Sequence, residues 1–224
     1  MAQKIKPNAY RLGITIHWAS RWFPKKSNII YLEEDQLIRD LIKKEMKQAG
    51  IAEIIIERSS DKIQITIKTA KPGLIIGRGG KGIEDFKLKL EKAIKKLRKK
   101  LNLPLSFTLN LNIEEIKRFD VSAAVIAQQL ASDLEKRLPY RKTMKKGLDL
   151  IMQNRDVLGA KIKMGGRLDG AEISRRDFLI RGKMPLSSLR ANIDYGEATA
   201  FTTYGTVGVK VWIYKGDIFE EKQK

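Results

Sequence analysis

The sequence predicts an α/β (α+β) protein made of two consecutive globular units. Runs with apolar residues at three- and four-residue intervals are interspersed with short runs of period two, and beyond Gly159 glycines separate β-like runs. With 42% hydrophobic residues in 224, the chain has enough apolar material for real cores. Domains usually contain ~100–200 residues, so one or two are expected, and the composition argues against wholesale disorder.

The charge balance indicates a polyanionic partner. The chain has 45 Lys+Arg against 26 Asp+Glu, a net charge of +19 and a pI near 10.0. Such a surplus repels itself in the compact state unless a polyanion neutralises it, which makes nucleic acid the leading partner. The absence of cysteine excludes disulfides, thiolate zinc sites and cysteine nucleophiles. Since no signal-like start or apolar stretch of ~20 residues occurs, we expect a soluble, intracellular chain.

The first unit is expected to follow an extended arm at 1–34, for which an ordinary flexible terminus is the alternative. The sequence then predicts the order α-β-β-loop-α-β. The signals, in chain order, are helical spacing of apolar residues, two Ile-rich runs, a glycine-rich segment, a second helical run and a run of strict period two. The predicted elements are a helix from Asp35 to Ala49, strands at Ile51–Arg58 and Lys62–Thr69, a helix from Ile83 to Leu101 and a strand from Leu105 to Ile113.

The second unit opens with two predicted helices and continues into short β-like runs. The helices carry their apolar residues on one face, and Pro139 ends the first of them. The clearest strand alternates from Val207 to Ile213. We expect two helices packed on a mainly antiparallel sheet. The predicted boundaries are 120–138 and 141–154 for the helices, 114–217 for the C-terminal domain and 218–224 for a tail.

The segment 71–83, Lys-Pro-Gly-Leu-Ile-Ile-Gly-Arg-Gly-Gly-Lys-Gly-Ile, is the most informative stretch of the sequence. The segment does not fit a phosphate loop of the nucleotidase type, because Ile75 stands where a glycine is needed and Gly82 replaces the magnesium-binding hydroxyl. A dinucleotide fingerprint matches formally from Gly77 to Gly82. However, the preceding strand ends too early, and 97–102 contains no acid to bind a ribose.

The third interpretation is a loop that clamps the backbone of about four nucleotides of single-stranded nucleic acid. Glycines let the chain turn sharply and let phosphates approach, while the start of the next helix directs amide donors at them. The plain alternative is a glycine-rich turn with a basic tip. The order of elements at about 35–113 resembles a KH domain of the second type. The candidate RNA-binding residues of the loop are Gly77, Arg78, Gly79, Gly80 and Lys81.

A second candidate RNA contact lies on the predicted helix 141–154. Spacings of three and four residues place Lys142, Lys145 and Lys146 on one face, with Arg141 one turn from Lys145. Like charges this close destabilise a helix, so we interpret them as a phosphate-binding ridge, with a plain solvated face as the alternative. Arginine also suits bidentate phosphate contacts. The further basic RNA-contact candidates are Lys4, Arg11, Arg167, Arg175, Arg176 and Arg190.

Catalysis has little support in the sequence. The single histidine, His17, stands beside Trp18 and is expected to be structural or to stack on RNA. Carboxylates gather between Asp169 and Glu197, and we expect them to pair with the arginines near them. No nucleophile–base pair or metal-ligand spacing appears. We therefore expect no enzyme, no cofactor and no metal.

Over nearly its whole length the sequence resembles the S-three family of small-subunit ribosomal proteins, in its bacterial or organellar form. The start matches through Gln3-Lys4, Pro7 and Arg11-Leu12-Gly13-Ile14, and the glycine loop occupies the family's place. The C-terminal half carries the most specific matches. These are Gly166-Arg167-Leu168, Gly170-Ala171-Glu172-Ile173, Pro185-Leu186, Leu189-Arg190-Ala191, Ile193-Asp194-Tyr195, Thr202-Thr203-Tyr204-Gly205 and Gly208-Val209-Lys210-Val211-Trp212-Ile213.

The resemblance implies a structural protein of the small-subunit head, in the cytoplasm or an organelle. Such a protein binds small-subunit rRNA, neighbours the tenth and fourteenth head proteins, and helps line the channel through which mRNA enters. In that family an Arg-Arg-x-x-Lys cluster contacts incoming message and supports its unwinding; the matching residues are Arg141, Lys142 and Lys145. Lys142 departs from the usual arginine and lacks its bidentate fork. A free-standing KH protein of RNA decay or assembly stays open, and more remotely an enzyme with a cofactor at the glycine loop.

Overall fold

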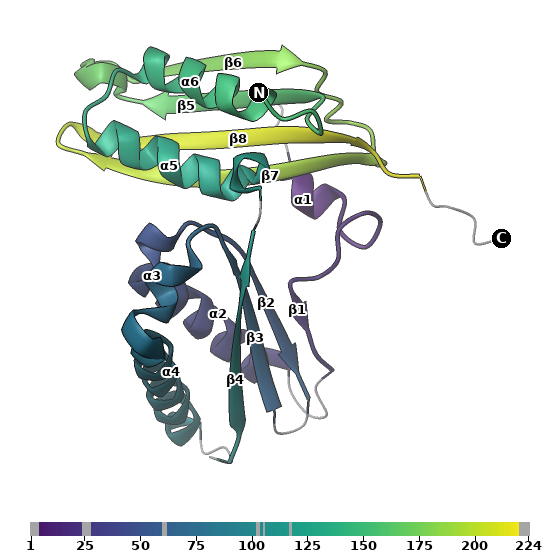
Figure 1. Cartoon of the computed structure of the whole chain (residues 1–224), viewed down its shortest axis with the longest axis vertical. Helices are drawn as coiled ribbons and strands as arrows, with labels where there is room; N and C mark the ends of the chain where they lie inside the picture. The colour runs from purple at the N-terminus through teal and green to yellow at the C-terminus, as the bar shows by residue number, and fades with distance from the viewer. Residues whose placement is uncertain are drawn as a thin grey trace. The chain divides into compact units, whose positions relative to one another are not determined.

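The computed structural model describes residues 5–23, 28–59, 62–101, 104, 106–116 and 118–219. The chain forms two compact units (Figure 1). We call Trp18–Lys117 the inserted unit, and Met1–His17 together with Arg118–Lys224 the terminal unit. Both combine helices with a sheet, so the predicted α/β class is confirmed. Residues expected to form one arm at 1–34 are shared between the two units.

The inserted unit is a four-stranded sheet with its long helices on one face (Figure 1). In the order β1-β2-β3-β4, β2 and β3 are antiparallel, whereas β1 and β4 pair parallel to their neighbours. The parallel β4 requires a crossover connection, which α3 and α4 supply. The elements are β1 (Ser20–Arg21), α2 (Asn28–Glu45), η1 (Lys47–Ala49), β2 (Ile51–Arg58), β3 (Lys62–Thr69), α3 (Pro72–Ile76), η2 (Arg78–Gly80), α4 (Lys81–Lys100) and β4 (Thr108–Glu115).

Isoleucines form much of the core of the inserted unit. Ile56, Ile65 and Ile67 are completely buried and pack in one cluster with Leu90 and Ile94 of α4. Burial of each such side chain contributes ~1.5–3 kcal/mol. The alternation along β3 is therefore the alternation of core and solvent, and the predicted strand bounds of β2 and β3 are confirmed.

Helix α2 begins at Asn28, well before the predicted start at Asp35, and buried ion pairs account for the difference. Glu34 and Asp35 look like a cap in the sequence, yet both lie buried within the helix. Glu34 accepts hydrogen bonds from Arg58 and from Nε of Arg98, the latter at 2.6 Å. Asp35 accepts one from Nε of Arg58 at 2.9 Å. Two carboxylates are tolerated in this interior because two arginines neutralise them.

The terminal unit is a four-stranded antiparallel sheet with α5 and α6 on one face (Figure 1). The strand order is β6-β5-β8-β7, so the last strand in the sequence is a central strand of the sheet. The predicted pair of helices on a mainly antiparallel sheet is confirmed. The elements are α1 (Pro7–Tyr10), η3 (Phe119–Val121), α5 (Ala123–Glu135), α6 (Tyr140–Met152), β5 (Gly159–Gly166), η4 (Leu168–Gly170), β6 (Arg175–Gly182), β7 (Ala191–Thr202) and β8 (Gly205–Asp217).

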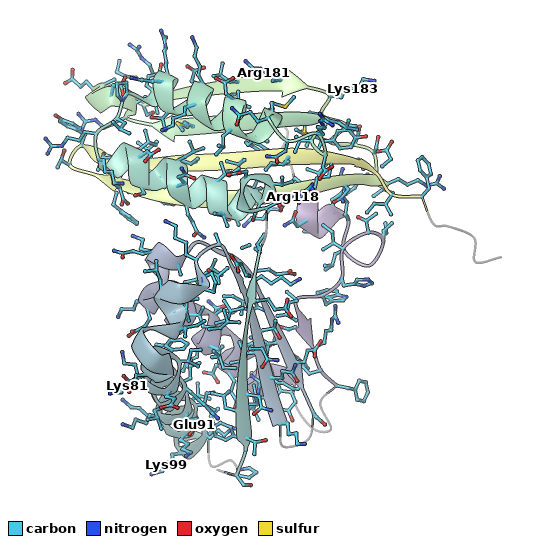
Figure 2. The ribbon with its side chains drawn as sticks, in the orientation of Figure 1. Lys81, Glu91, Lys99, Arg118, Arg181 and Lys183 are labelled. Atoms are coloured by element: carbon cyan, nitrogen blue, oxygen red, sulfur yellow. The ribbon has the colours of Figure 1, made fainter. Side chains whose placement is uncertain are left out.

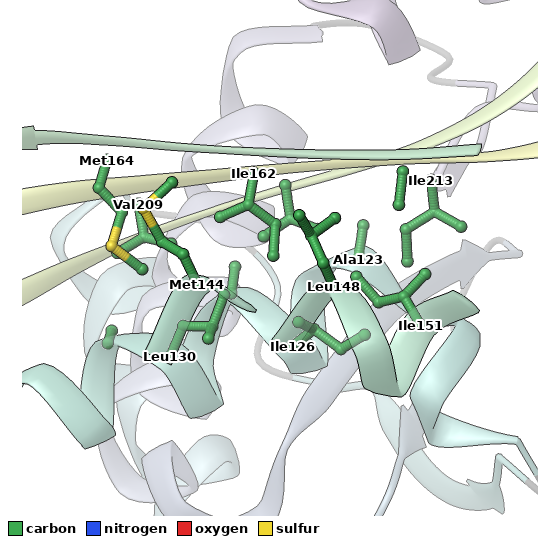
Figure 3. Packing of buried hydrophobic residues seen from close by; sticks show 14 of the residues in the cluster. Ala123, Ile126, Leu130, Met144, Leu148, Ile151, Ile162, Met164, Val209 and Ile213 are labelled. Carbon is green, nitrogen blue, oxygen red and sulfur yellow. The ribbon is translucent and has the colours of Figure 1, made fainter. Parts of the chain in front are cut away.

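The core of the terminal unit lies between these helices and the sheet (Figure 3). Met144 and Ile151 of α6 and Ile126 of α5 pack with Ile162 of β5 and Val209 of β8, and all five are buried. Because side chains alternate along a strand, the residues between these core positions point to the opposite face of the sheet.

Residues 5–17 belong to the terminal unit, where α1 contacts β7. Their anchor is Arg11, whose side chain is completely buried. A buried guanidinium is tolerated where its donors are satisfied, and here backbone carbonyls supply the acceptors. The acceptors are the carbonyl oxygens of Pro7 at 3.2 Å, Leu186 at 3.0 Å, Ser188 at 2.7 Å and Ala191 at 2.7 Å.

Candidate nucleic-acid interface

The glycine loop connects α3 to α4 in the inserted unit. Gly77, Gly79 and Gly80 have φ angles of 69°, 63° and 80°, a region that residues with a Cβ rarely adopt. Gly82, in the first turn of α4, is required for a different reason. A Cβ there would lie 2.8 Å from the carbonyl oxygen of Ile75, so only glycine lets α4 start this close to α3.

The loop brings three kinds of RNA-binding group together. No side chain caps the N-terminus of α4 at Gly80, so its first amides keep their capacity for an anion. Lys81 is exposed beside them. Leu74 and Ile76 of α3 are also exposed, at 61% and 37%, whereas Ile75 between them is buried. Phosphates, a cation and apolar contacts to bases thus fit side by side; the side chain of Arg78 lies outside the described residues.

Helix α4 continues this interface as a basic surface. Part of its charge is neutralised within the unit, by pairs such as Lys89 Nζ with Glu45 at 2.9 Å. Figure 2 shows Lys81 and Lys99 at opposite ends of the helix. Within the described ranges, six lysines of α4 have no ion-pair partner, and this unneutralised charge attracts phosphates. They are Lys81, Lys87, Lys92, Lys96, Lys99 and Lys100.

Arg141, Lys142 and Lys145, which we call the α6 ridge, are all exposed on the first turns of α6. The buried side of the same turns carries Thr143 and Met144. The first turn of α6 contains no acid, so the ridge places cations at the positive end of the helix dipole, where they are unfavourable. This arrangement becomes favourable when an anion binds there.

Arg141 is held in place by its neighbour. Its Nε donates to Oη of Tyr140 at 3.0 Å, and its guanidinium carbon lies 5.7 Å from the centre of that ring. The hydrogen bond to Tyr140 raises the pKa of Arg141, and the same contact restricts where the guanidinium points. Its remaining donors keep their capacity for a phosphate.

A groove of about 650 Å³ runs between α5 and α6 beside the α6 ridge. Its lining combines the ridge with Gln129 and Asp133 of α5 and with apolar side chains such as Leu130. Asp149, also in the lining, is paired with Nη1 of Arg181 at 2.6 Å. In the part of the chain that the structure describes, no carboxylate pairs with a ridge residue. The groove therefore offers cations to an extended polyanion.

The structure corrects the RNA-contact prediction for Arg11. This side chain is buried and its donors are directed to backbone carbonyls, so it anchors residues 5–17. Nothing in the sequence distinguishes a buried arginine from one that reaches a phosphate. Lys4 lies outside the described residues.

The remaining arginine candidates do not form one surface. Arg175 and Arg176 are exposed on β6, one edge of the sheet, whereas Arg190 precedes β7 at the other edge. Arg190 lies 5.8 Å from the ring of Phe219. Arg167 is exposed, yet it donates to the carbonyl oxygens of two residues of its own unit, at 3.0 and 2.9 Å. Arg175 and Arg176 are therefore the ones with the most donors left for a ligand.

The carboxylates of this unit serve its structure. Asp194 lies 3.4 Å from Nζ of Lys215 and Glu197 pairs with Lys6, so the expected pairing of these two acids with arginines is wrong. The hydrogen bond from Lys6 lowers the pKa of Glu197. Across the described ranges, no cluster of His, Asp and Glu could hold a metal ion. No described helix is long and apolar enough to cross a membrane.

Comparison with known proteins matches both halves of the chain. The KH domain family matches residues 37–120, and the family described as "Ribosomal protein S3, C-terminal domain" matches residues 130–213. Relatives named "Small ribosomal subunit protein uS3" are similar over nearly the full length. The protein of Pseudothermotoga lettingae is 44% identical, covering 97% of this chain and 99% of its own. That of Finegoldia magna is 47% identical, covering 97% and 85%.

Proposed function

Because this chain belongs to the uS3 family of small ribosomal subunit proteins, we propose that it is a structural component of the subunit head that binds rRNA and contacts mRNA. The observation that carries the mRNA contact is the α6 ridge, three exposed cations at a helix N-terminus that form no ion pair among the described residues. Asp169 instead accepts a hydrogen bond from the backbone N–H of Tyr140 at 3.1 Å. We place this ridge at the channel through which mRNA enters. We further propose the tenth and fourteenth head proteins as neighbours, and binding rather than catalysis as the role.

The ridge holds message through its phosphates and does not read bases. Arg141 provides a fork for phosphate oxygens, while Lys142 and Lys145 act as point charges. Each such contact releases counterions, and three contacts to single-stranded RNA give a slope of log affinity against log salt of about −2. Cations that bind the single strand as it leaves a base-paired segment of the message stabilise its unwound state.

The inserted unit supplies a second contact in this proposal. The positive φ angles of Gly77, Gly79 and Gly80 and the uncapped start of α4 leave backbone amides available to a single-stranded segment. Lysines along α4 extend the attraction to further phosphates. We assign rRNA to this unit and mRNA to the α6 ridge.

The test is a charge reversal on the ridge, Arg141→Glu plus Lys145→Glu. Both side chains are exposed, so we expect normal assembly into small subunits but slower translation through a stable hairpin in the message. The measurement is the rate of hairpin unwinding by purified ribosomes that contain the variant.

The matched control is Lys136→Glu plus Arg155→Glu, which changes the charge equally at exposed positions of the same unit. It is expected to leave unwinding unchanged. Normal unwinding by fully assembled ridge-variant ribosomes contradicts the proposal, as does equal slowing by the control.

A further inference from the structure

The sheet of the terminal unit has a second face, opposite α5 and α6, which we call the open face. On β5, Ala160, Ile162 and Met164 are buried against the helices, so Lys161, Lys163 and Gly165 point the other way. The strand registers place the residues of the neighbouring strands beside them. These are Arg176, Phe178 and Ile180 on β6, Gly208, Lys210 and Trp212 on β8, and Tyr195, Glu197 and Thr199 on β7.

Among the described residues of the terminal unit, an apolar cluster covers one end of this face. Met184 and Leu186 pack there with Ile193, Tyr214 and Trp212. Further along, Phe178 is 55% exposed and Ile180 48% exposed. Large apolar side chains that stand exposed beside one another on a sheet indicate a ligand surface.

Aromatic rings and cations alternate on the open face. Nζ of Lys161 lies 5.1 Å from the ring centre of Phe178 and 5.4 Å from that of Trp212. Trp212 in turn lies 5.4 Å from Tyr195. Rings interleaved with cations are the chemistry by which proteins hold single-stranded nucleic acid, because bases stack on the rings and phosphates meet the cations.

The charges of the open face favour an anion. Lys161, Lys163, Lys210 and Arg176 project from it, and Glu197 is the only carboxylate among the residues placed on it above. Asp217, at the covered end, accepts a hydrogen bond from Oη of Tyr214. Glu197 is already bound by Lys6 and by Oη of Tyr195. An anionic ligand therefore meets little electrostatic repulsion on this face.

Two glycines leave the open face flat across one end of its two central strands. Gly165 and Gly208 are register partners in the two central strands. Neither has a positive φ angle, and a Cβ on Gly208 would meet only the carbonyl oxygen of Gly165, at 3.8 Å. Nothing in the described part of the unit requires glycine at position 208, although glycine weakens a strand interior. Close approach of a ligand to the backbone is the remaining physical reason.

We propose that the open face binds unpaired nucleotides of RNA. Bases stack against Phe178 and Trp212, while the backbone crosses the flat strip at Gly165 and Gly208 and its phosphates meet Lys163 and Lys210. The inference deepens the proposed function, since its ligand is RNA, but the surface is distinct from the α6 ridge, which lies on the helix side of the same sheet.

The test measures binding of the free full-length protein to a short, unstructured, fluorescently labelled RNA by anisotropy. Phe178→Leu keeps an apolar side chain but removes the ring, and we expect affinity to fall roughly tenfold, as for the loss of one stacked base.

Gly208→Thr places a good strand former on the flat strip, so we expect weaker RNA binding with undiminished thermal stability. Lys163→Gln plus Lys210→Gln is expected to reduce the salt dependence of binding.

Two controls separate this inference from the proposed function. Phe23→Leu makes the same change at a 93% exposed ring of the inserted unit, and we expect unchanged affinity. The open-face variants are repeated in the Arg141→Glu plus Lys145→Glu protein, where we expect the same factor of weakening.

If the ridge substitutions weaken RNA binding and the open-face substitutions do not, the result supports the ridge and contradicts the open face. Unchanged affinity in folded Phe178→Leu and Gly208→Thr overturns the inference, as does binding of an acidic protein but not RNA to this face.

Discussion

A single buried arginine holds the first residues of the chain to strands made from its last third. Arg11 donates to backbone carbonyls within the segment 185–191, which has no regular secondary structure until β7 begins at Ala191. Its charge therefore belongs to the fold and not to the RNA-binding surface. The net charge of +19 therefore overstates the charge that a ligand meets by this buried arginine. Arg58 is also buried, with 3% of its side chain exposed, but the acids paired with it already cancel its charge in that sum.

We predict that Arg11→Ala lowers the free energy of unfolding of the terminal unit by at least about 3 kcal/mol, because several buried carbonyls lose their donors at once. Arg11→Lys is expected to recover little, since an ammonium lacks the planar fork. Urea denaturation monitored by circular dichroism provides the measurement.

The matched control is Arg175→Ala, an exposed arginine of the same unit, with an expected change within ~0.5 kcal/mol. If Arg11→Ala is as stable as this control, the anchoring role is wrong.

Among the elements, α2, β2 and α4 are connected by charge as well as by apolar packing. Glu34 of α2 lies between Arg58 of β2 and Arg98 of α4, and its side chain is completely buried. Arg98 also lies 4.6 Å from the ring centre of Phe107, just before β4. The start of α2 thus depends on two elements that follow it in the sequence.

We predict that Glu34→Gln destabilises the inserted unit by about 3–5 kcal/mol, because two guanidinium groups lose their shared counter-charge. Glu53→Gln is the control, since its pair with Lys68 is solvent-exposed and contributes only ~0–1 kcal/mol. Denaturant titration of both variants compares them. Equal stability of the two variants contradicts a structural role for the buried acid.

Sequence reasoning located elements where periodicity is local and failed where partners are distant. The hairpin of β2 and β3 was predictable to the residue, because isoleucines of both strands are buried and those of β3 alternate with more exposed residues. The start of α2 was not, because Glu34 and Asp35 resemble a cap until their partners at Arg58 and Arg98 are known. Strand β1, only two residues long, has no periodicity to detect.

The candidate binding surfaces show the same difference between what local spacing predicts and what depends on distant partners. Helical spacing predicted a basic ridge of Arg141, Lys142, Lys145 and Lys146, and the structure places all four on the exposed side of α6. The choice of Arg141, Lys142 and Lys145 as the mRNA contact came from the family resemblance. The open face did not follow from local spacing, because the neighbours of Phe178 and Trp212 are set by strand register across residues far apart in the chain. RNA contact by either surface stays a prediction.

At the scale of the molecule, each unit has a core of its own. The cluster around Ile65 draws only on the inserted unit, and the clusters around Ile162 and Tyr214 draw only on the terminal unit. The domain boundaries 35–113 and 114–217 stay predictions beside the compact units, whose limits along the chain follow His17 and Lys117.

Two separate cores predict two thermal transitions. We expect calorimetry to resolve them, with Arg11→Ala lowering the midpoint of one and Glu34→Gln that of the other. Each variant serves as the control for the other. A single transition, shifted by both substitutions, would show that the units unfold together.

The position of β8 has a consequence for how the chain is made. Synthesis delivers the polypeptide from its N-terminus, and β8 is the last strand to emerge, yet β5 and β7 contact each other only through it. The inserted unit is complete in sequence by residue 117 and is free to fold while translation continues. The terminal unit must wait for the final strand, and throughout that interval its first seventeen residues have been exposed, with the pocket for Arg11 not yet synthesised.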